Sequence, residues 1–256
     1  MNTEKRTKIN KLISNWPKGT VYTAFFLKQL GYNYDLLRFY KKSKWLESVG
    51  NGAYKLDGDN IDWFGGIYAL QTQLNLDMHV GGKTALELKG HSHYITFKTP
   101  KIFLYGVRGE KLPQWFKQYD WDTKVKFVAT GLFSTSMPDT LSNYAYRDFK
   151  IVISAPERAA MEMLYHVPKE QGFDEAQKIM EGLFTLRPEE VQMLLERCNS
   201  IKVKRLFMYI VEKHDFPWVN KLKMDKINFG KGERQIVKQG ILNQKYKITV
   251  PKKYEV

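Results

Sequence analysis

The stretch that decides the fold is residues 33–56, which read NYDLLRFYKKSKWLESVGNGAYKL. Its first half predicts a helix capped by Asn33, because apolar side chains recur on one face at Leu36, Leu37 and Tyr40. Its second half predicts a β-hairpin, because two short strand-like runs flank Asn51-Gly52. Asn-Gly is the strongest two-residue hairpin signal, and both central positions of such a turn are expected to take a positive φ.

Two more helices are predicted before this stretch. The first covers 4–16, where apolar residues recur at helical spacing at Ile9, Leu12, Ile13 and Trp16. After a break at 17–19, Thr20 is expected to cap the second helix and Gly31 to end it, with an apolar stripe of Tyr22, Phe26 and Leu30. Three helices and a hairpin predict a winged helix-turn-helix domain over 1–56.

A larger domain is expected over 61–256, after a polar join at 57–60. Aromatic and β-branched residues predict strands at 94–97, 102–107, 125–130 and 149–154, and in the tail at 227–229, 235–237 and 246–250. Two capping boxes are expected to begin helices, one from Thr84 and Glu87 and one from Ser154 and Glu157. The predicted fold class is therefore α+β, an N-terminal winged helix-turn-helix followed by a larger mixed α/β domain.

The net charge of +14 is concentrated at the two ends of the chain. Residues 1–56 hold eleven Lys and Arg against three acidic residues, and residues 221–256 hold ten against three. Basic clusters attract polyanions, because neutralised phosphates release condensed counterions. Two alternatives stay open for the tail: its lysines contact DNA beside the winged helix, or they protect a solvated strand edge.

The helix over 34–42 is predicted to enter the major groove of double-stranded DNA, which admits one α-helix. Asn33 and Arg38 carry groups that can read base edges, whereas flexible lysines suit phosphates. The candidate DNA-binding residues are Asn33, Tyr34, Arg38, Lys41, Lys42 and Lys44, with Asn51 at the tip of the wing. A winged helix that docks a protein partner instead of DNA is an alternative interpretation.

The sequence contains no convincing catalytic constellation. His91 and His93 share a strand face, but no third metal ligand is placed by the pattern. Glu87 and Lys89 match the end of a nuclease motif, although such a tripeptide is common by chance and Glu87 is expected to cap a helix. We therefore expect no catalytic residue, metal or cofactor, and a restriction-endonuclease-like metal-dependent nuclease is the alternative.

Composition also restricts the location of the protein. Cys198 is the single cysteine, which excludes an internal disulfide framework and fits a reducing compartment. Its place on an apolar helical stripe predicts core packing. No apolar run approaches the roughly 20 residues that a membrane helix needs. A cytoplasmic protein without a membrane partner is expected.

Four segments together carry a resemblance to a known family. They are 81–88 with His93-Tyr94, 153–160, 230–234 and 246–251, in that order along the chain. This ordered set resembles the AbiEi family, which contains antitoxins and transcriptional regulators of abortive-infection type IV toxin–antitoxin systems.

The resemblance implies a repressor that binds inverted repeats in the promoter of its own operon through the winged helix. It also implies that the C-terminal domain opposes a nucleotidyltransferase-like toxin without forming a stable complex with it. No catalytic residue is carried over from the family.

Overall fold

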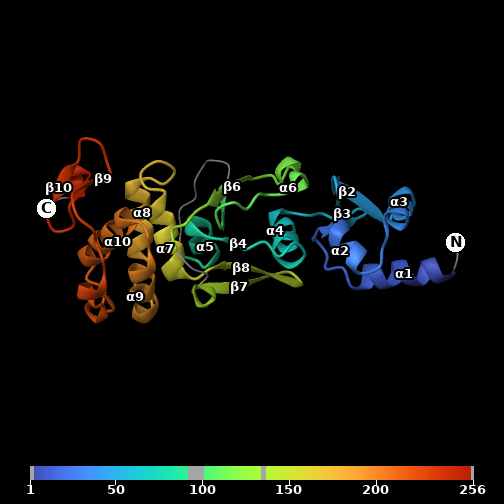
Figure 1. The fold of residues 1–256 in the computed structure, drawn as a ribbon, viewed down its shortest axis with the longest axis horizontal. Helices are drawn as coiled ribbons and strands as arrows, with labels where there is room; N and C mark the ends of the chain where they lie inside the picture. Colours follow the sequence, from blue (N-terminus) through green and yellow to red (C-terminus); the bar gives the residue numbers. More distant parts are fainter. Residues whose placement is uncertain (1–2, 92–100, 134–136, 255–256) are drawn as a thin grey trace.

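The computed structural model describes residues 3–91, 101–133 and 137–254. The molecule is elongated, with its two termini at opposite ends (Figure 1). A small helical unit lies at the N-terminal end, a five-stranded sheet lies in the middle, and helices with a small sheet form the C-terminal end. This mixture of helices with parallel and antiparallel strands confirms the predicted α+β class.

The N-terminal unit contains three helices and a three-stranded antiparallel sheet of order β1-β3-β2. Its elements are α1 (Thr3–Ser14), β1 (Tyr22–Thr23), α2 (Ala24–Gln29), α3 (Tyr34–Lys42), β2 (Leu46–Gly50) and β3 (Ala53–Leu56). Its core includes six side chains that are at most 3% exposed: Ile9, Leu12, Trp16, Leu27, Leu37 and Tyr40. This order and pairing are compatible with the predicted winged helix-turn-helix.

The predicted start of the second helix is wrong. Thr23, not Thr20, is the N-cap of α2, and its side chain accepts a hydrogen bond from the Phe26 amide at 3.2 Å. The Thr20 hydroxyl instead donates to the Pro17 carbonyl at 2.6 Å. Because residues 22–23 pair with β3 as a strand, the helix can begin only after them.

The predicted hairpin forms, but its turn differs from the expected one. Gly52 has a φ of +75°, whereas Asn51 is not among the residues with positive φ. The pairing of β2 with β3 also shifts between Ser48 and Gly50. This irregularity supplies the bend that a second left-handed residue would otherwise supply.

The central sheet has the strand order β6-β5-β4-β8-β7. Its strands are β4 (Met78–Val80), β5 (Lys101–Gly106), β6 (Lys124–Ala129), β7 (Leu141–Tyr146) and β8 (Phe149–Ser154). β5 pairs parallel with β6, β4 pairs parallel with β8, and the other two pairings are antiparallel. The sequence predicted β5, β6 and β8 and missed β4 and β7, and the predicted strand at 94–97 lies outside the described residues.

Helices surround this sheet and continue beyond it. They are α4 (Trp63–Thr72), α5 (Gly82–Leu88), α6 (Gln114–Gln118), α7 (Pro156–Tyr165), α8 (Phe173–Glu181), α9 (Pro188–Arg197) and α10 (Ile201–Lys213). Among the described residues, none of the helices is long and apolar enough to cross a membrane. Cys198, at the end of α9, is 3% exposed as predicted, and burial raises the pKa of its thiol to about 11.

The tail forms a small sheet of order β10-β11-β9. Its strands are β9 (Arg234–Gln235), β10 (Ile241–Asn243) and β11 (Ile248–Val250). The strand predicted at 227–229 is absent from this described segment, because the carbonyl of Phe229 accepts a hydrogen bond from the buried Arg205 rather than from a neighbouring strand.

Both predicted capping boxes are wrong, because their side chains bond to residues from other parts of the chain instead of to the helix N-terminus. α5 begins at Gly82, and the Thr84 hydroxyl inside it accepts a hydrogen bond from the Phe103 amide on β5 at 3.0 Å. Glu87 does not cap α5, and its Oε1 lies 3.5 Å from Lys83 Nζ.

At the second box, Ala155 rather than Ser154 is the N-cap of α7. The Ser154 hydroxyl donates to Glu162, and Glu157 accepts hydrogen bonds from Arg187.

Gln73, the residue after α4, attaches the N-terminal unit to the rest of the chain. Its Oε1 accepts a hydrogen bond from the Thr23 amide and its Nε2 donates to the Val21 carbonyl, each at 2.7 Å. All three residues are buried. The side-chain amide thus pairs with the backbone like an additional strand residue, and it holds the N-terminal unit against α4.

Candidate nucleic-acid interface

α3 is the element that the sequence assigned to DNA recognition. It begins where the Asn33 side chain accepts a hydrogen bond from the Leu36 amide at 2.9 Å. Leu37 and Tyr40 are at most 1% exposed and hold the helix against the core of the unit. The opposite side of the helix is therefore the side that solvent or a ligand can reach.

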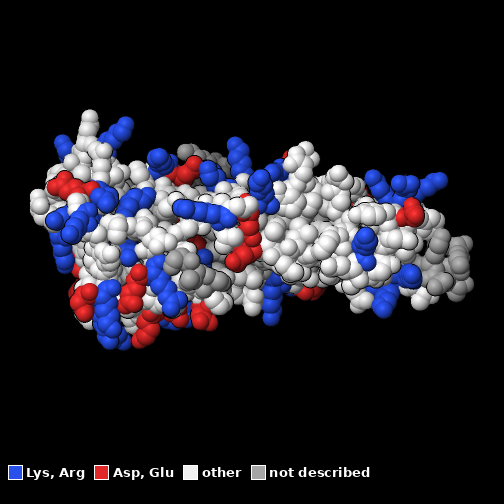
Figure 2. Space-filling view, in the orientation of Figure 1, with Lys and Arg blue, Asp and Glu red and all other residues white. Residues whose placement is uncertain are grey.

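Every residue predicted for this interface is exposed: Asn33, Tyr34, Arg38, Lys41, Lys42, Lys44 and Asn51. Figure 2 shows the blue Lys and Arg side chains gathered at the upper right, where α3 lies in Figure 1. Within the described part of the chain, none of Arg38, Lys41 and Lys42 takes part in an ion pair. Their charges are thus available to a polyanion.

Asn33 also caps α3, and this capping restricts how its side chain can bond to a DNA base. Recognition of adenine by asparagine uses the side-chain oxygen and nitrogen together. The oxygen of Asn33 already accepts the capping hydrogen bond from the Leu36 amide, which fixes the side chain toward its own helix and disfavours a two-bond contact with a base. Arg38 is an exposed residue whose planar guanidinium can donate two parallel hydrogen bonds, so it is the better candidate for reading a base edge.

The structure does not form one continuous basic surface from the two ends of the sequence. Lys8 and Lys11 of α1 are exposed in the N-terminal unit. The tail strands β9, β10 and β11 lie at the opposite end of the molecule from α3 (Figure 1). Lys223, which is exposed like Lys226, is hydrogen-bonded to Gln192 of α9, also far from α3 in Figure 1, so these lysines do not extend the face of α3.

A second polar cluster lies between β4 and α7, and the sequence analysis missed it. The Glu162 carboxylate, 1% exposed, accepts four hydrogen bonds: from His79 Nε2 and Arg158 Nε, both at 2.8 Å, from Ser154 Oγ at 2.7 Å, and from the Gly82 amide at 3.0 Å. Burial would raise the pKa of Glu162, but His79 and Arg158 outweigh it and lower that pKa to about 2.

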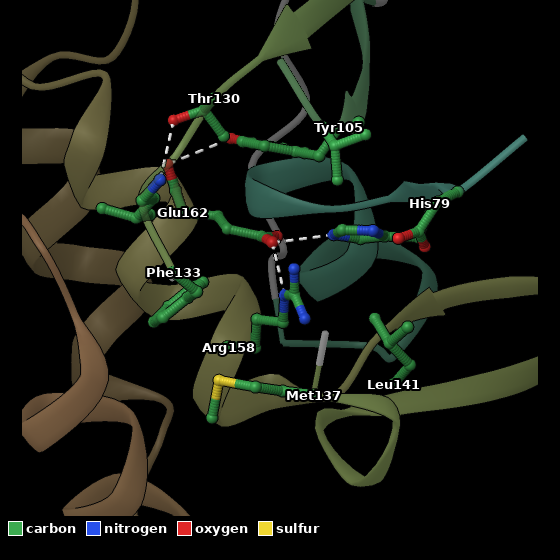
Figure 3. Close-up of a pocket in the computed structure, with 12 residues that line it drawn as sticks. His79, Tyr105, Thr130, Phe133, Met137, Leu141, Arg158 and Glu162 are labelled. Carbon is green, nitrogen blue, oxygen red and sulfur yellow. Dashed lines mark hydrogen bonds and ion pairs between the residues drawn. The ribbon is translucent and has the colours of Figure 1, made fainter. Parts of the chain in front are cut away.

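A cavity of about 130 Å³ lies beside this cluster (Figure 3). The Arg158 guanidinium lies 5.1 Å from the centre of the Phe133 ring and also donates to Thr140. Because both oxygens of Glu162 are occupied, the cluster is suited to fixing α7 against the sheet rather than to binding a cation. The only sequence signal for it is the spacing of Arg158 and Glu162, four residues apart on one helix.

The contacts of Glu87 do not favour the nuclease alternative. Its carboxylate faces the Lys83 ammonium, which also bonds Glu175. Burial raises the pKa of Glu87. No group of three His, Cys, Asp or Glu side chains in the described ranges is arranged to hold a metal, and His93 lies outside them.

Comparison with known families places the chain among antitoxin transcriptional regulators. A family model described as "Transcriptional regulator, AbiEi antitoxin, Type IV TA system" matches residues 99–251. A second model, "Transcriptional regulator, AbiEi antitoxin N-terminal domain", matches residues 5–97. The chain belongs to the AbiEi family of type IV toxin–antitoxin systems, as the ordered sequence segments indicated.

A solved structure has the same overall fold. The crystal structure of the RV2827C protein from Mycobacterium tuberculosis is 14% identical, with a TM-score of 0.63. The similarity covers 97% of this chain and 91% of that one, so it includes both the N-terminal unit and the C-terminal part. A comparison with curated protein sequences gave no match.

Proposed function

We propose that the protein is a DNA-binding repressor of its own operon and the antitoxin that opposes a nucleotidyltransferase-like toxin. The observation that carries the DNA-binding part is the exposed face of α3, where Arg38, Lys41 and Lys42 have no carboxylate partner among the described residues. Family membership supports the regulatory role and the toxin–antitoxin context.

The roles of the side chains follow from their chemistry. α3 enters the major groove, and the planar guanidinium of Arg38 bonds a base edge with two parallel hydrogen bonds, the arrangement that recognises guanine. Lys41, Lys42 and Lys44 contact phosphates and fix the register of the helix. Tyr34, 61% exposed at the first turn of α3, lies against the same groove wall. Asn51 at the wing tip reaches the neighbouring backbone.

The operator is an inverted repeat, and two copies of the chain bind its half-sites. A two-fold symmetric operator requires two identical recognition helices about one turn of DNA apart. The elongated shape places the bulk of each C-terminal part away from α3, so the second copy has room beside the first (Figure 1).

A band-shift titration against DNA upstream of the gene tests this proposal. Arg38→Ala should weaken specific binding by about tenfold, because one bidentate base contact discriminates by about 1–3 kcal/mol. Lys42→Ala should weaken specific and non-specific binding alike. It should also flatten the slope of log K against log salt by about 1, as expected for one lost phosphate contact.

Lys150→Ala is the matched control, because Lys150 is exposed on β8 and lies outside the N-terminal unit. It should bind like the wild type. Unchanged operator affinity in both α3 variants would place recognition elsewhere. Stoichiometric capture of one protein partner without any DNA binding would favour the protein-docking alternative.

The antitoxin part has its own test. Co-expression with a nucleotidyltransferase-like toxin encoded by the adjacent gene should restore growth that the toxin alone arrests. The Arg38→Ala variant should still restore growth from an unrelated promoter, because the C-terminal domain carries the opposition to the toxin. Failure of the wild type to restore growth would contradict the antitoxin role and leave the repressor role standing.

A further inference from the structure

A groove between α1 and α2 is the feature of the N-terminal unit for which DNA recognition provides no role. Its volume is about 470 Å³, within the range of sites for small organic ligands. Its apolar wall is made of Leu12, Tyr22, Phe26, Leu30 and Tyr32. Lys8, Lys11 and Asn15 of α1 form the polar side, and Leu30 is 51% exposed at the rim.

The two tyrosines of the wall contribute aromatic rings rather than hydroxyls. The Tyr22 hydroxyl already donates to the Asn15 carbonyl at 3.1 Å, and the Tyr32 hydroxyl donates to the Lys8 carbonyl at 3.2 Å. The Tyr22 ring meets the Phe26 ring edge to face at 5.3 Å. An aromatic wall of this kind suits a flat aromatic molecule, which makes the same edge-on ring contacts.

The charges of the groove are of one sign. Lys8 and Lys11 are exposed, lie one turn apart on α1, and form no ion pair with any described residue. Among the side chains that the structure describes, none of those lining the groove is acidic. Two copies of this chain docked groove to groove would bring lysine against lysine. An anionic group on an aromatic body is therefore the complementary ligand.

The groove is also connected to α3. Leu30, Gly31 and Tyr32 form the turn between α2 and α3, in which Gly31 has a φ of +86° and the Tyr32 amide donates to the Leu27 carbonyl at 2.9 Å. The centre of the Tyr32 ring lies 6.5 Å from the centre of the Tyr40 ring, and Tyr40 is fully buried on α3. A ligand against Tyr32 thus touches the segment that orients the recognition helix.

We propose that this groove binds a small aromatic carboxylate and that the bound ligand weakens operator binding. The ring of the ligand lies on the aromatic wall, and its carboxylate lies between the ammonium groups of Lys8 and Lys11. Binding places one negative charge between two cations of the N-terminal unit and so lowers its net positive charge, which opposes association with a polyanion, and it also holds the α2–α3 turn. The regulatory half rests on the proposed function, whereas the binding site does not.

Calorimetry on the full chain without DNA tests the site, with naphthoate as the probe and naphthalenemethanol as its neutral counterpart. Naphthoate should bind about tenfold more tightly, because hydrogen bonds between charged groups are stronger than those to a neutral hydroxyl. Lys8→Met and Lys11→Met should each remove most of that preference and leave the affinity for naphthalenemethanol unchanged. Lys18→Met, exposed in the same unit but outside the groove, should change neither affinity.

Leu30→Glu is a variant that keeps the fold, because Leu30 is half exposed, and it should abolish naphthoate binding by placing a carboxylate at the rim. Equal affinity for the two probes, or unchanged naphthoate binding in both lysine variants, would overturn the site.

A band shift with saturating naphthoate tests the regulatory half. The operator Kd should rise about tenfold, and saturating operator should weaken naphthoate binding by the same factor, because coupling between two sites is reciprocal. Naphthoate affinity that is equal with and without operator would overturn the regulation and leave the site in place. Absence of operator binding in any condition would contradict the proposed function, while the calorimetric result still decides the site.

Discussion

His79 Nε2 lies 2.8 Å from Glu162 Oε1, in a buried pair that joins β4 to α7 across 83 residues of sequence. Arg158 and Ser154 bond the same carboxylate, so one acidic group joins two strands, β4 and β8, to α7. The side chain of His79 is 6% exposed and that of Glu162 is 1% exposed, so a partner lost from this buried pair is costly to replace.

Glu162→Ala should therefore destabilise the protein strongly. The change leaves the Arg158 guanidinium and the His79 imidazole without their acceptor, and breaking such a buried network costs about 3–5 kcal/mol. Urea unfolding followed by circular dichroism measures the loss. Glu233→Ala, at an exposed residue of the tail, should stay within about 0.5 kcal/mol of the wild type. Equal effects of the two changes would contradict the role given to Glu162.

Acid should weaken the fold through His166. Burial lowers the pKa of His166 to about 4, and the cations of Lys202 and Lys126 act in the same direction while Glu170 opposes them. Because the unfolded chain then binds a proton that the folded chain does not, this contribution to stability is present above pH 6.5 and is lost as the pH falls toward 4.

The measurement is the urea midpoint between pH 7 and pH 4. His166→Gln should flatten the fall across that interval, because the replacement does not titrate. Parallel curves for the variant and the wild type would show that other groups cause the acid loss.

Gln73→Leu should loosen the attachment of the N-terminal unit. The substitution keeps most of the side-chain volume but leaves the Thr23 amide and the Val21 carbonyl buried without partners, at a cost of about 2–3 kcal/mol. Limited proteolysis should then cut between residues 57 and 60 sooner than in the wild type. Gln118→Leu, on the exposed end of α6, should leave the rate of cutting unchanged.

Gly65→Ala should also destabilise, although alanine usually favours a helix over glycine. A Cβ at position 65 would overlap the carbonyl oxygen of Gly19, part of the backbone of the N-terminal unit. The backbone must shift to relieve the overlap, so we expect a loss of about 1–3 kcal/mol in thermal or urea unfolding. Gly172→Ala is the control, because nothing lies within 4 Å of its added Cβ. A stabilised Gly65→Ala variant would mean that α4 and the Gly19 segment are not in contact.

Helix starts illustrate where sequence-based prediction succeeds and fails. Asn33 caps α3 as predicted, because its partner is the amide of Leu36, three residues away. Thr84 and Ser154 do not cap as predicted, because the Phe103 amide and the Glu162 carboxylate bind their hydroxyls instead. A local pattern predicts a cap only when no distant group competes for the same oxygen.

For the candidate interface, too, local sequence patterns predicted some features, whereas others depended on distant parts of the chain. Spacing along α3 indicated that Arg38 and Lys42 point away from Leu37 and Tyr40, and the structure leaves both basic residues exposed. The spacing could not show whether a carboxylate from another element would neutralise them. It also could not reveal the groove between α1 and α2, since that groove depends on how two helices pack.

The sequence by itself determined three N-terminal helices, a hairpin and an outward basic face, because apolar periodicity and turn residues act over a few positions. Only the tertiary structure decided how the N-terminal unit is attached to the rest of the chain and which polar groups are buried in the larger part. The Gln73 contact spans 50 residues and the His79–Glu162 contact spans 83. Such contacts form only after distant segments pack together. A polar group that is buried in this way no longer bonds water, so it forms a hydrogen bond with the nearest available partner, whatever its distance in sequence.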